Sequence, residues 1–221
     1  MSALLEQLTR RQLLWHGNSQ HTAYQAVPSG YAELDQQLAG GFPATGLIDI
    51  QTGTGIGELR LLLPYLQQQQ SGGRLLVFIS PLAEPCADML CAAGIVLSQL
   101  VIITPKTGKD ALWAAEQCLQ SGCCASVLLW QIPLKQAQAR RLQLAAEQGA
   151  ASLILLRRPQ QGLSLPVNLS IKLQPHSQGV LLSVQKRKGG WPAAPFLVDM
   201  QNRWPGLCFS TEPHWQARRK A

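Results

Sequence analysis

The residues whose types and spacing come nearest to a known chemistry are the glycines of residues 52–57. This segment reads TGTGIG, follows the apolar run Leu47–Gln51 and precedes a helical pattern at residues 59–70. A strand, a glycine-rich turn and a helix form the layout of a phosphate-binding loop, whose backbone N–H groups cradle phosphate oxygens. A working loop has the pattern Gly-x4-Gly-Lys-Ser/Thr, in which the lysine reaches the β- and γ-phosphates and the hydroxyl holds magnesium.

The residues that would carry out this phosphate chemistry are replaced. If Gly57 is the second glycine of the pattern, Thr52 stands for the first, Glu58 for the lysine and Leu59 for the hydroxyl residue. A carboxylate would repel a triphosphate there, and it can itself serve as the anion at the helix N-terminus. The sequence thus predicts a degenerate phosphate loop that binds no nucleotide, made of Thr52, Gly53, Gly55, Gly57, Glu58 and Leu59. The alternative is a glycine turn unrelated to nucleotides.

The elements that must position this loop alternate in type along the chain. Strand-like apolar runs at 75–79, 101–104, 127–132 and 152–156 alternate with helical patterns at 59–70, 84–93, 108–121 and 135–148. This alternation predicts an α/β fold with a mostly parallel sheet and helices on both faces. Pro64 should kink the first of these helices or shorten its first turn. Strand-like runs at 169–173 and 180–185, separated by a turn at 175–179, predict an antiparallel extension of the C-terminal sheet edge.

Composition divides the chain into three parts. Residues 1–27 are predicted to be an N-terminal helix with a leucine stripe and a polar linker, residues 28–190 the α/β domain, and residues 191–221 a basic tail containing Trp and Pro. The N-terminal helix either folds back onto its own domain or reaches a neighbouring domain through the linker. Both alternatives are open.

The overall composition indicates a globular chain. Of its 221 residues, 46% are hydrophobic and 14% charged, which is enough apolar material for a core. No window reaches the roughly 18 apolar residues of a membrane span, and the first residues include Glu6, Arg10 and Arg11, unlike a signal peptide. We expect a soluble, cytoplasmic protein. Its six cysteines form no Cys-x-x-Cys pair, so we expect no metal and treat them as small core residues.

The positive charge lies in the last third of the chain. Residues 1–150 hold nine Lys and Arg against ten Asp and Glu, whereas residues 151–221 hold ten against Asp199 and Glu212 only. The candidate contacts to DNA or to a protein partner are Arg157, Arg158, Lys186, Arg187, Lys188, Trp191, Trp204, Trp215, Arg218, Arg219 and Lys220. Cations neutralise phosphates and indoles stack on bases, but the same residue types dominate protein interfaces. A solvated tail, with Trp191 packed on the sheet, is the third alternative.

Residues 28–190 resemble the RecA family. The resemblance is carried by Pro28–Ile50, which runs from a glycine turn through a short helix containing Leu34 and Asp35 to a GGFPATG turn and the first core strand. It implies a RecA-like core. A RecA-type ATPase would carry a water-activating glutamate after the strand at 75–79 and a magnesium-binding aspartate directly after residues 127–129 of the strand at 127–132. Here Ser80 follows the first strand, and Trp130 and Gln131 follow Leu129, so we expect a pseudo-ATPase with no cofactor.

Within this family the chain is similar to the ImuA proteins, the RecA-like accessory proteins of bacterial SOS mutagenesis. The matching residues are Pro28–Ile50, Gly57–Leu59 and the basic segment KRKGGWP at residues 186–192. The resemblance implies a non-catalytic role in translesion synthesis, with a Y-family-like polymerase subunit, an error-prone replicative polymerase, RecA and single-stranded DNA as partners. The alternative is a SulA-like inhibitor that binds the division protein FtsZ, although SulA proteins are shorter. An active ATPase is disfavoured because Glu58 opposes the substrate charge.

Overall fold

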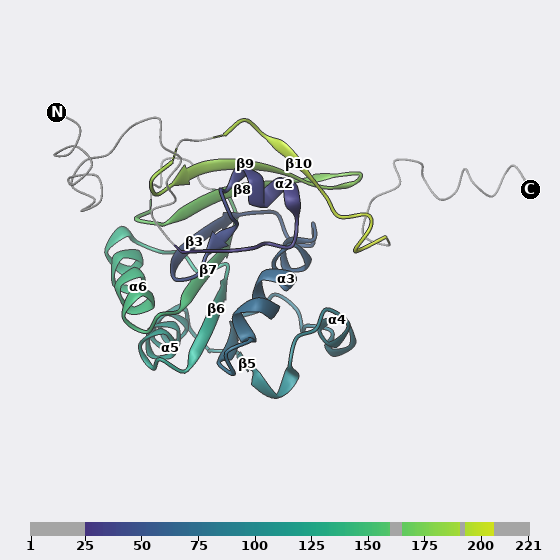
Figure 1. The fold of residues 1–221 in the computed structure, drawn as a ribbon. Coiled ribbons are helices and arrows are strands. Elements are labelled where there is room, and N and C mark those ends of the chain that lie inside the picture. The colour runs from purple at the N-terminus through teal and green to yellow at the C-terminus, as the bar shows by residue number, and fades with distance from the viewer. Residues whose placement is uncertain (1–24, 160–164, 191–192, 206–221) are drawn as a thin grey trace, which may run out of the picture.

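An eight-stranded, mostly parallel sheet with helices on both faces forms the body of the structure (Figure 1). The computed structural model describes residues 25–159, 165–190 and 193–205. The strands are β1 (Ala26–Val27), β2 (Phe42–Pro43), β3 (Gly46–Gln51), β4 (Leu75–Ile79), β5 (Leu100–Ile103), β6 (Cys124–Trp130), β7 (Ser152–Arg157), β8 (Leu169–His176), β9 (Gly179–Arg187) and β10 (Phe196–Asp199). The helices are α2 (Ala32–Gln37), α3 (Glu58–Gln70), α4 (Ala87–Ala92), the 3-10 helix η1 (Leu97–Gln99), α5 (Gly108–Gln120) and α6 (Gln136–Gln148).

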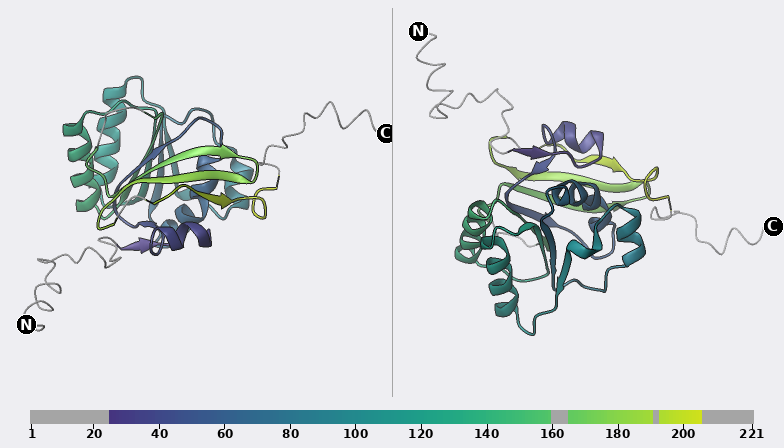
Figure 2. Two further views of the ribbon diagram at one scale, coloured as in Figure 1. Left: turned by 90° about the horizontal axis from the view of Figure 1, so that it is seen from above. Right: turned by 60° about the horizontal axis from the view of Figure 1, so that its bottom comes forward.

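The main sheet has the strand order β10-β9-β8-β3-β7-β6-β4-β5, and the strands from β8 to β5 run parallel to one another. Its central strands are apolar on both faces because both faces are covered. Ile48 and Ile50 of β3 pack into the cluster that contains α3, and Leu47 packs into the cluster that contains α5 and α6. Figure 2 shows these two helical layers on opposite sides of the sheet. The predicted α/β class with a mostly parallel sheet is confirmed.

The C-terminal strands extend this sheet in the antiparallel sense. β8 pairs parallel with β3, but β9 pairs antiparallel with β8, and β10 pairs antiparallel with β9. The antiparallel extension is therefore confirmed. β10 was not expected, and it lies in the segment assigned to the tail. Val198 and Met200 are fully buried, so the core continues beyond residue 190.

Several element bounds differ from the sequence pattern. α3 continues through Pro64, which is buried and packs so closely on Gly30 that a Cβ added there would lie 2.6 Å from Pro64 Cβ. This packing offsets the backbone hydrogen bond that proline cannot donate. β9 continues through Lys186 and Arg187, beyond the predicted run at 180–185, and α4 is shorter than the predicted 84–93.

The five cysteines in the described residues are not mainly core residues. Among them only Cys124 is buried, whereas Cys86, Cys91 and Cys123 are exposed and Cys118 is intermediate. Cys208 lies outside the described residues. Within the described ranges, no group of three or more His, Cys, Asp or Glu side chains is arranged to hold a metal ion. In the same residues, no helix is both long enough and apolar enough to span a membrane.

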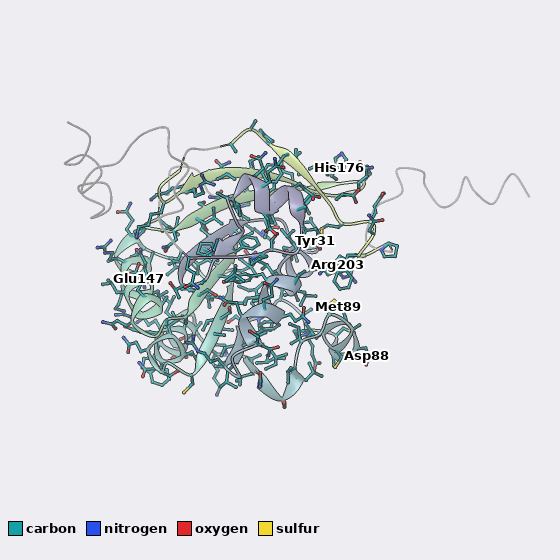
Figure 3. The ribbon with its side chains drawn as sticks, in the orientation of Figure 1. Tyr31, Asp88, Met89, Glu147, His176 and Arg203 are labelled. Atoms are coloured by element: carbon teal, nitrogen blue, oxygen red, sulfur yellow. The ribbon has the colours of Figure 1, made fainter. Side chains whose placement is uncertain are left out.

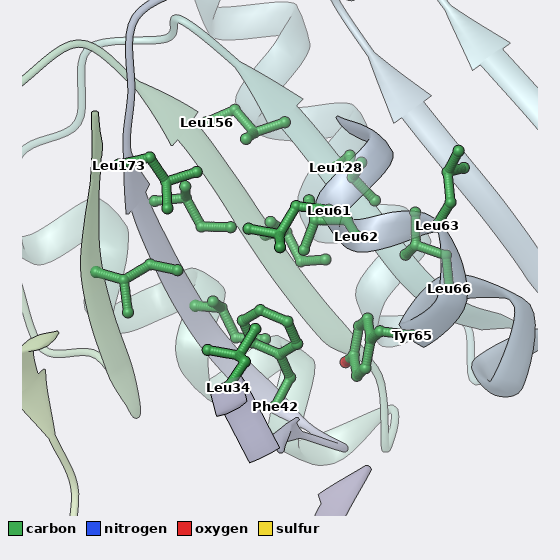
Figure 4. Close-up of a cluster of buried hydrophobic side chains, with 14 of the residues drawn as sticks. Leu34, Phe42, Leu61, Leu62, Leu63, Tyr65, Leu66, Leu128, Leu156 and Leu173 are labelled. Atoms are coloured by element: carbon green, nitrogen blue, oxygen red, sulfur yellow. The ribbon is translucent and has the colours of Figure 1, made fainter. Parts of the chain in front are cut away.

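The segment before β3 is anchored on α3. Leu34 and Leu38, one helical turn apart, are both fully buried, as their shared face predicts. Phe42 contacts the Tyr65 ring edge-on, with 5.3 Å between the ring centres (Figure 4). The Tyr65 hydroxyl donates to the Pro43 carbonyl at 2.7 Å. Burial raises the pKa of Tyr65 to about 12, so this hydroxyl stays protonated as a donor.

A buried ion pair joins the three central strands. Arg157, the last residue of β7, donates from Nε and Nη2 to the Asp49 carboxylate of β3, with 2.9 Å between Nη2 and Oδ2. Ser170 Oγ of β8 donates to the same carboxylate at 2.8 Å. Asp49 and Arg157 are 1% and 7% exposed, so neither charge could be solvated if the other were lost.

Replacing Arg157 with alanine is expected to lower the free energy of unfolding by about 3–5 kcal/mol, because the Asp49 charge would remain buried without its cation. Chemical denaturation followed by circular dichroism measures this. The matched control is Arg158→Ala at the adjacent exposed residue, expected to change stability by less than about 0.5 kcal/mol. Equal losses for the two variants would contradict a structural role specific to Arg157.

Candidate functional site

The glycine-rich turn lies between the end of β3 and the start of α3. Thr52 N–H donates to the Arg157 carbonyl at 2.9 Å, so the turn begins at the carboxyl end of the parallel strands. Gly55 and Gly57 have positive φ angles of 75° and 98°, a backbone region that glycine enters without strain. α3 then begins at Glu58. The predicted strand–turn–helix arrangement is present.

The Glu58 carboxylate folds back onto this turn. Its Oε1 accepts the Gly55 N–H at 3.1 Å, and its Oε2 accepts the Ile56 N–H at 3.0 Å. Glu58 is only 8% exposed. Backbone N–H groups at a helix N-terminus are the groups that bind phosphate in a working loop. Here two of them already have an anionic partner from the chain itself.

The neighbouring side chains are apolar where magnesium chemistry would need oxygen ligands. Leu59 is partly buried and packs against the core cluster that contains α3, as does Ile56. Thr52 stands where the pattern has its first glycine. Its hydroxyl donates to the Gly53 carbonyl at 2.8 Å.

The ends of β4 and β6 carry no carboxylate next to the loop in the described residues. Ser80 follows β4, and its N–H donates to the Ile103 carbonyl at 2.9 Å. Trp130 ends β6 and is buried. Its ring contacts the Phe78 ring edge-on, with 5.3 Å between the ring centres. Glu84, the nearest acidic residue after β4 in sequence, is exposed. A serine bonded through its backbone N–H therefore stands where a RecA-type ATPase has its catalytic glutamate. A core tryptophan stands where such an ATPase has its magnesium-binding aspartate.

Two of the predicted contact residues are buried inside the fold. Arg157 holds Asp49, as described above. Arg187 is 9% exposed and donates from Nη1 to the Gln37 carbonyl at the end of α2, at 3.0 Å. A cation there also satisfies a helix C-terminus. Neither guanidinium is a surface contact, which corrects the prediction for these two residues.

The split of the KRK cluster follows from strand geometry. Successive side chains of a strand point to opposite faces, so Arg187 points inward while Lys186 and Lys188 on either side are exposed. Lys186 Nζ donates to the Leu165 carbonyl at 3.0 Å. Arg158 is exposed as well. The remaining predicted contacts Trp191, Trp215, Arg218, Arg219 and Lys220 lie outside the described residues.

An open depression brings Lys186 close to a cation that sequence reasoning missed. It has a volume of about 470 Å³ and is lined by Gln136, Ala137, Arg140, Leu165, Pro166 and Lys186. Arg140 comes from α6. In the sequence it reads as one of the polar residues on the solvated face of a helix. Only the packing of α6 beside the start of β8 places it near Lys186. The described residues of this lining include two cations and no carboxylate.

Trp204 is part of the folded domain, not of a free tail. Its Nε1–H donates to the Tyr31 hydroxyl at 3.2 Å, and the Arg60 guanidinium lies 5.4 Å from its ring centre. The Arg203 guanidinium lies over the Tyr31 ring, 5.5 Å from its centre, and Figure 3 labels both residues. Trp204 is only half-buried, so these contacts join the segment after β10 to α2 and α3 while leaving part of the indole exposed.

The fold and the loop define an α/β protein with a phosphate-loop turn that is occupied by its own carboxylate. A family model described as "Cell division inhibitor SulA" matches residues 52–152. The chain is 34% identical over 102 residues to the cell division inhibitor SulA of Edwardsiella piscicida, which covers 46% of this chain and 60% of that protein. It is 29% identical over 135 residues to the RecA protein of Picosynechococcus sp., covering 60% of this chain and 37% of RecA.

The chain is thus related to SulA and RecA proteins, although it spans less than two thirds of the length of these two relatives. The crystal structure of SulA from Pseudomonas aeruginosa matches 51% of this chain and 98% of that chain, with 27% identity and a TM-score of 0.43. That TM-score is too low to establish a common fold.

Replacing Glu58 with alanine is expected to lower the free energy of unfolding by about 1–2 kcal/mol, because two loop N–H groups and the start of α3 lose a charged acceptor. Thermal and urea denaturation measure the change. Glu84→Ala, which removes an exposed carboxylate, is the control and should leave stability within about 0.5 kcal/mol of the native value. A Glu58→Ala protein as stable as the control would show that the carboxylate does not hold the loop.

Proposed function

We propose that the chain is a non-catalytic RecA-related accessory protein, similar to the ImuA proteins, that acts in SOS-induced translesion DNA synthesis. The observation that carries this proposal is the Glu58 carboxylate bonded to the Gly55 and Ile56 N–H groups. A phosphate would have to displace a side chain of its own charge sign, which costs both hydrogen bonds and like-charge repulsion. The protein then works by contacts and not by ATP turnover.

The absence of ATP hydrolysis is supported by three positions acting together. Phosphoryl transfer needs a cation on the phosphates, a metal ligand and a group that positions the attacking water. Glu58, Trp130 and Ser80 stand at these positions and supply none of the three. Loss of one group could leave weak activity, but loss of all three removes charge neutralisation, metal binding and water activation. The protein is therefore a pseudo-ATPase without a nucleotide cofactor.

Three exposed cations of the described residues are the contacts proposed for DNA or an acidic partner. Lys186 and Lys188 are exposed on β9 and just after it, and Arg140 faces the same depression as Lys186. Cations placed along a surface neutralise phosphates, and this binding weakens steeply with salt. Single-stranded DNA, RecA, a Y-family-like polymerase subunit and the error-prone replicative polymerase are the proposed partners.

The second candidate function is inhibition of cell division by binding FtsZ. It is favoured by the family match over residues 52–152 and by two relatives that carry the name cell division inhibitor SulA. The basic segment 186–192 and the strands β8 to β10 lie beyond that match. They are the part of the chain that supports the translesion role over the inhibitor role.

A pull-down of the full chain on three immobilised baits separates these functions: the Y-family-like polymerase subunit, FtsZ and an unstructured DNA strand. We expect retention on the polymerase subunit and not on FtsZ.

The double variant Arg140→Glu/Lys186→Glu should reduce retention on DNA at least about tenfold, because two phosphate contacts become repulsive. The control Lys106→Glu/Lys109→Glu makes the same charge change at two exposed residues that do not line the depression. Retention on FtsZ alone would establish the inhibitor role and overturn the translesion role.

A further inference from the structure

Exposed apolar side chains gather at one edge of the sheet. Of the seven large hydrophobic side chains that are exposed in the described residues, four lie within residues 96–102: Val96, Leu97, Val101 and Ile102. Leu82, a fifth exposed residue, follows β4, whose end is bonded to the carboxyl end of β5 through the Ser80 N–H. Monomeric proteins seldom expose such residues in one contiguous group.

β5 is the edge strand at this end of the sheet. It pairs with β4 on one side, and within the described residues no strand pairs with its other side. Val101 and Ile102 are 39% and 43% exposed although neighbouring strand residues point to opposite faces. Both faces of the sheet therefore end in an incompletely covered apolar side chain, as expected of a strand that lacks its next neighbour.

The two edges of the sheet differ in their protection. At the far edge, β10 is preceded by Pro195 and ends in Asp199, whose N–H donates to Glu33 Oε1 of α2 at 3.0 Å. Charged residues, prolines and covering helices are the usual devices that prevent edge-to-edge pairing. β5 has no charged residue, no proline and no bulge. An unprotected edge of this kind is suited to pairing with another strand.

We propose that β5 pairs antiparallel with β5 of a second copy of this chain, which joins two sheets into one across a two-fold axis. An axis perpendicular to the sheet reverses the strand direction and keeps each face on its own side, so the helical layers continue across the interface. Residues that face each other across the axis then lie on the same face of the sheet. Ile102 meets apolar side chains of the second β5 on one face, and Val101 does so on the other.

The charge pattern favours a second copy over other occupants. In a two-fold interface a residue near the axis lies close to its own copy, so a charge there would meet a like charge. From Met89 to Pro105 the chain has no Asp, Glu, Lys, Arg or His. This stretch includes η1 and β5 entirely. A surface that binds a charged partner would carry side chains of the opposite charge. A surface that pairs with its own copy is expected to be neutral, as this stretch is.

The paired strands are only four residues long, so the interface is small. Val96, Leu97 and Leu82 add apolar area around it, and we expect a dimer that dissociates in the micromolar range. Sedimentation equilibrium of the full chain between about 1 and 200 μM tests this. The expected result is a concentration-dependent change from the mass of one chain to twice that mass. A mass of one chain throughout would overturn the proposal.

Ile102→Lys tests the site itself. Two lysines would face each other near the axis, so we expect the dissociation constant to rise at least about tenfold, with unchanged circular dichroism because Ile102 is already partly exposed. An equimolar mixture of Ile102→Lys and Ile102→Glu chains should form a dimer again, since opposite charges then meet. Leu144→Lys is the control: this residue is exposed on α6, which packs on β3 and β7. It should leave the dimer unchanged.

Two outcomes would overturn the proposal. A dimer unaffected by Ile102→Lys would place the interface elsewhere. A ladder of trimers and larger species would mean that β5 receives a different segment of the next chain, because head-to-tail pairing does not close after two copies.

Hydrogen exchange gives a second measurement that needs no variant. Within residues 100–103, the amides that face away from β4 should exchange more slowly at 200 than at 1 μM, by about the ratio of the free-chain fractions.

Discussion

The contact between the Glu58 carboxylate and the turn before it governs what this sheet can do. A helix N-terminus that follows a glycine turn is an anion site, and its N–H groups need a partner. Here Gly55 and Ile56 find that partner three and two residues further on. The geometry of a phosphate loop is thereby kept, and its anion is part of the chain. The fold can remain intact without nucleotide and present its surfaces to other molecules.

Other charged side chains of the molecule are also bonded to groups of the chain itself. Asp49 and Arg157 neutralise one another inside the sheet, and Arg187 is used to hold the end of α2. These charges stabilise the scaffold and are not available to partners. Lys186 and Lys188 remain exposed, so the basic surface is smaller than the count of cations in the last third of the chain suggests. These two lysines lie at the end of β9, which is separated from the β5 edge by the other strands of the sheet (Figure 1).

Local patterns were sufficient for much of the fold, and long-range contacts account for the rest. Buried apolar runs predicted β3, β4, β6 and β7 to within a few residues, because strands covered on both faces have no polar alternation to obscure them. The loop and the replacement at Glu58 were also readable from spacing. The burial of Arg157 was not, since it depends on Asp49, which lies 108 positions earlier. β10 and the approach of Arg140 to Lys186 likewise depend on chain packing that no local pattern records.

Calorimetric titration of the full-length chain with magnesium ATP, with and without single-stranded DNA, tests the central claim most directly. Because Glu58 occupies the loop N–H groups, we expect no saturable heat of binding up to about 1 mM nucleotide and no release of phosphate in a parallel assay. Saturable binding in the micromolar range would contradict this. It would mean that the carboxylate leaves the loop when phosphate is present, and the protein would then have to be regarded as a nucleotide-binding member of its RecA-related group.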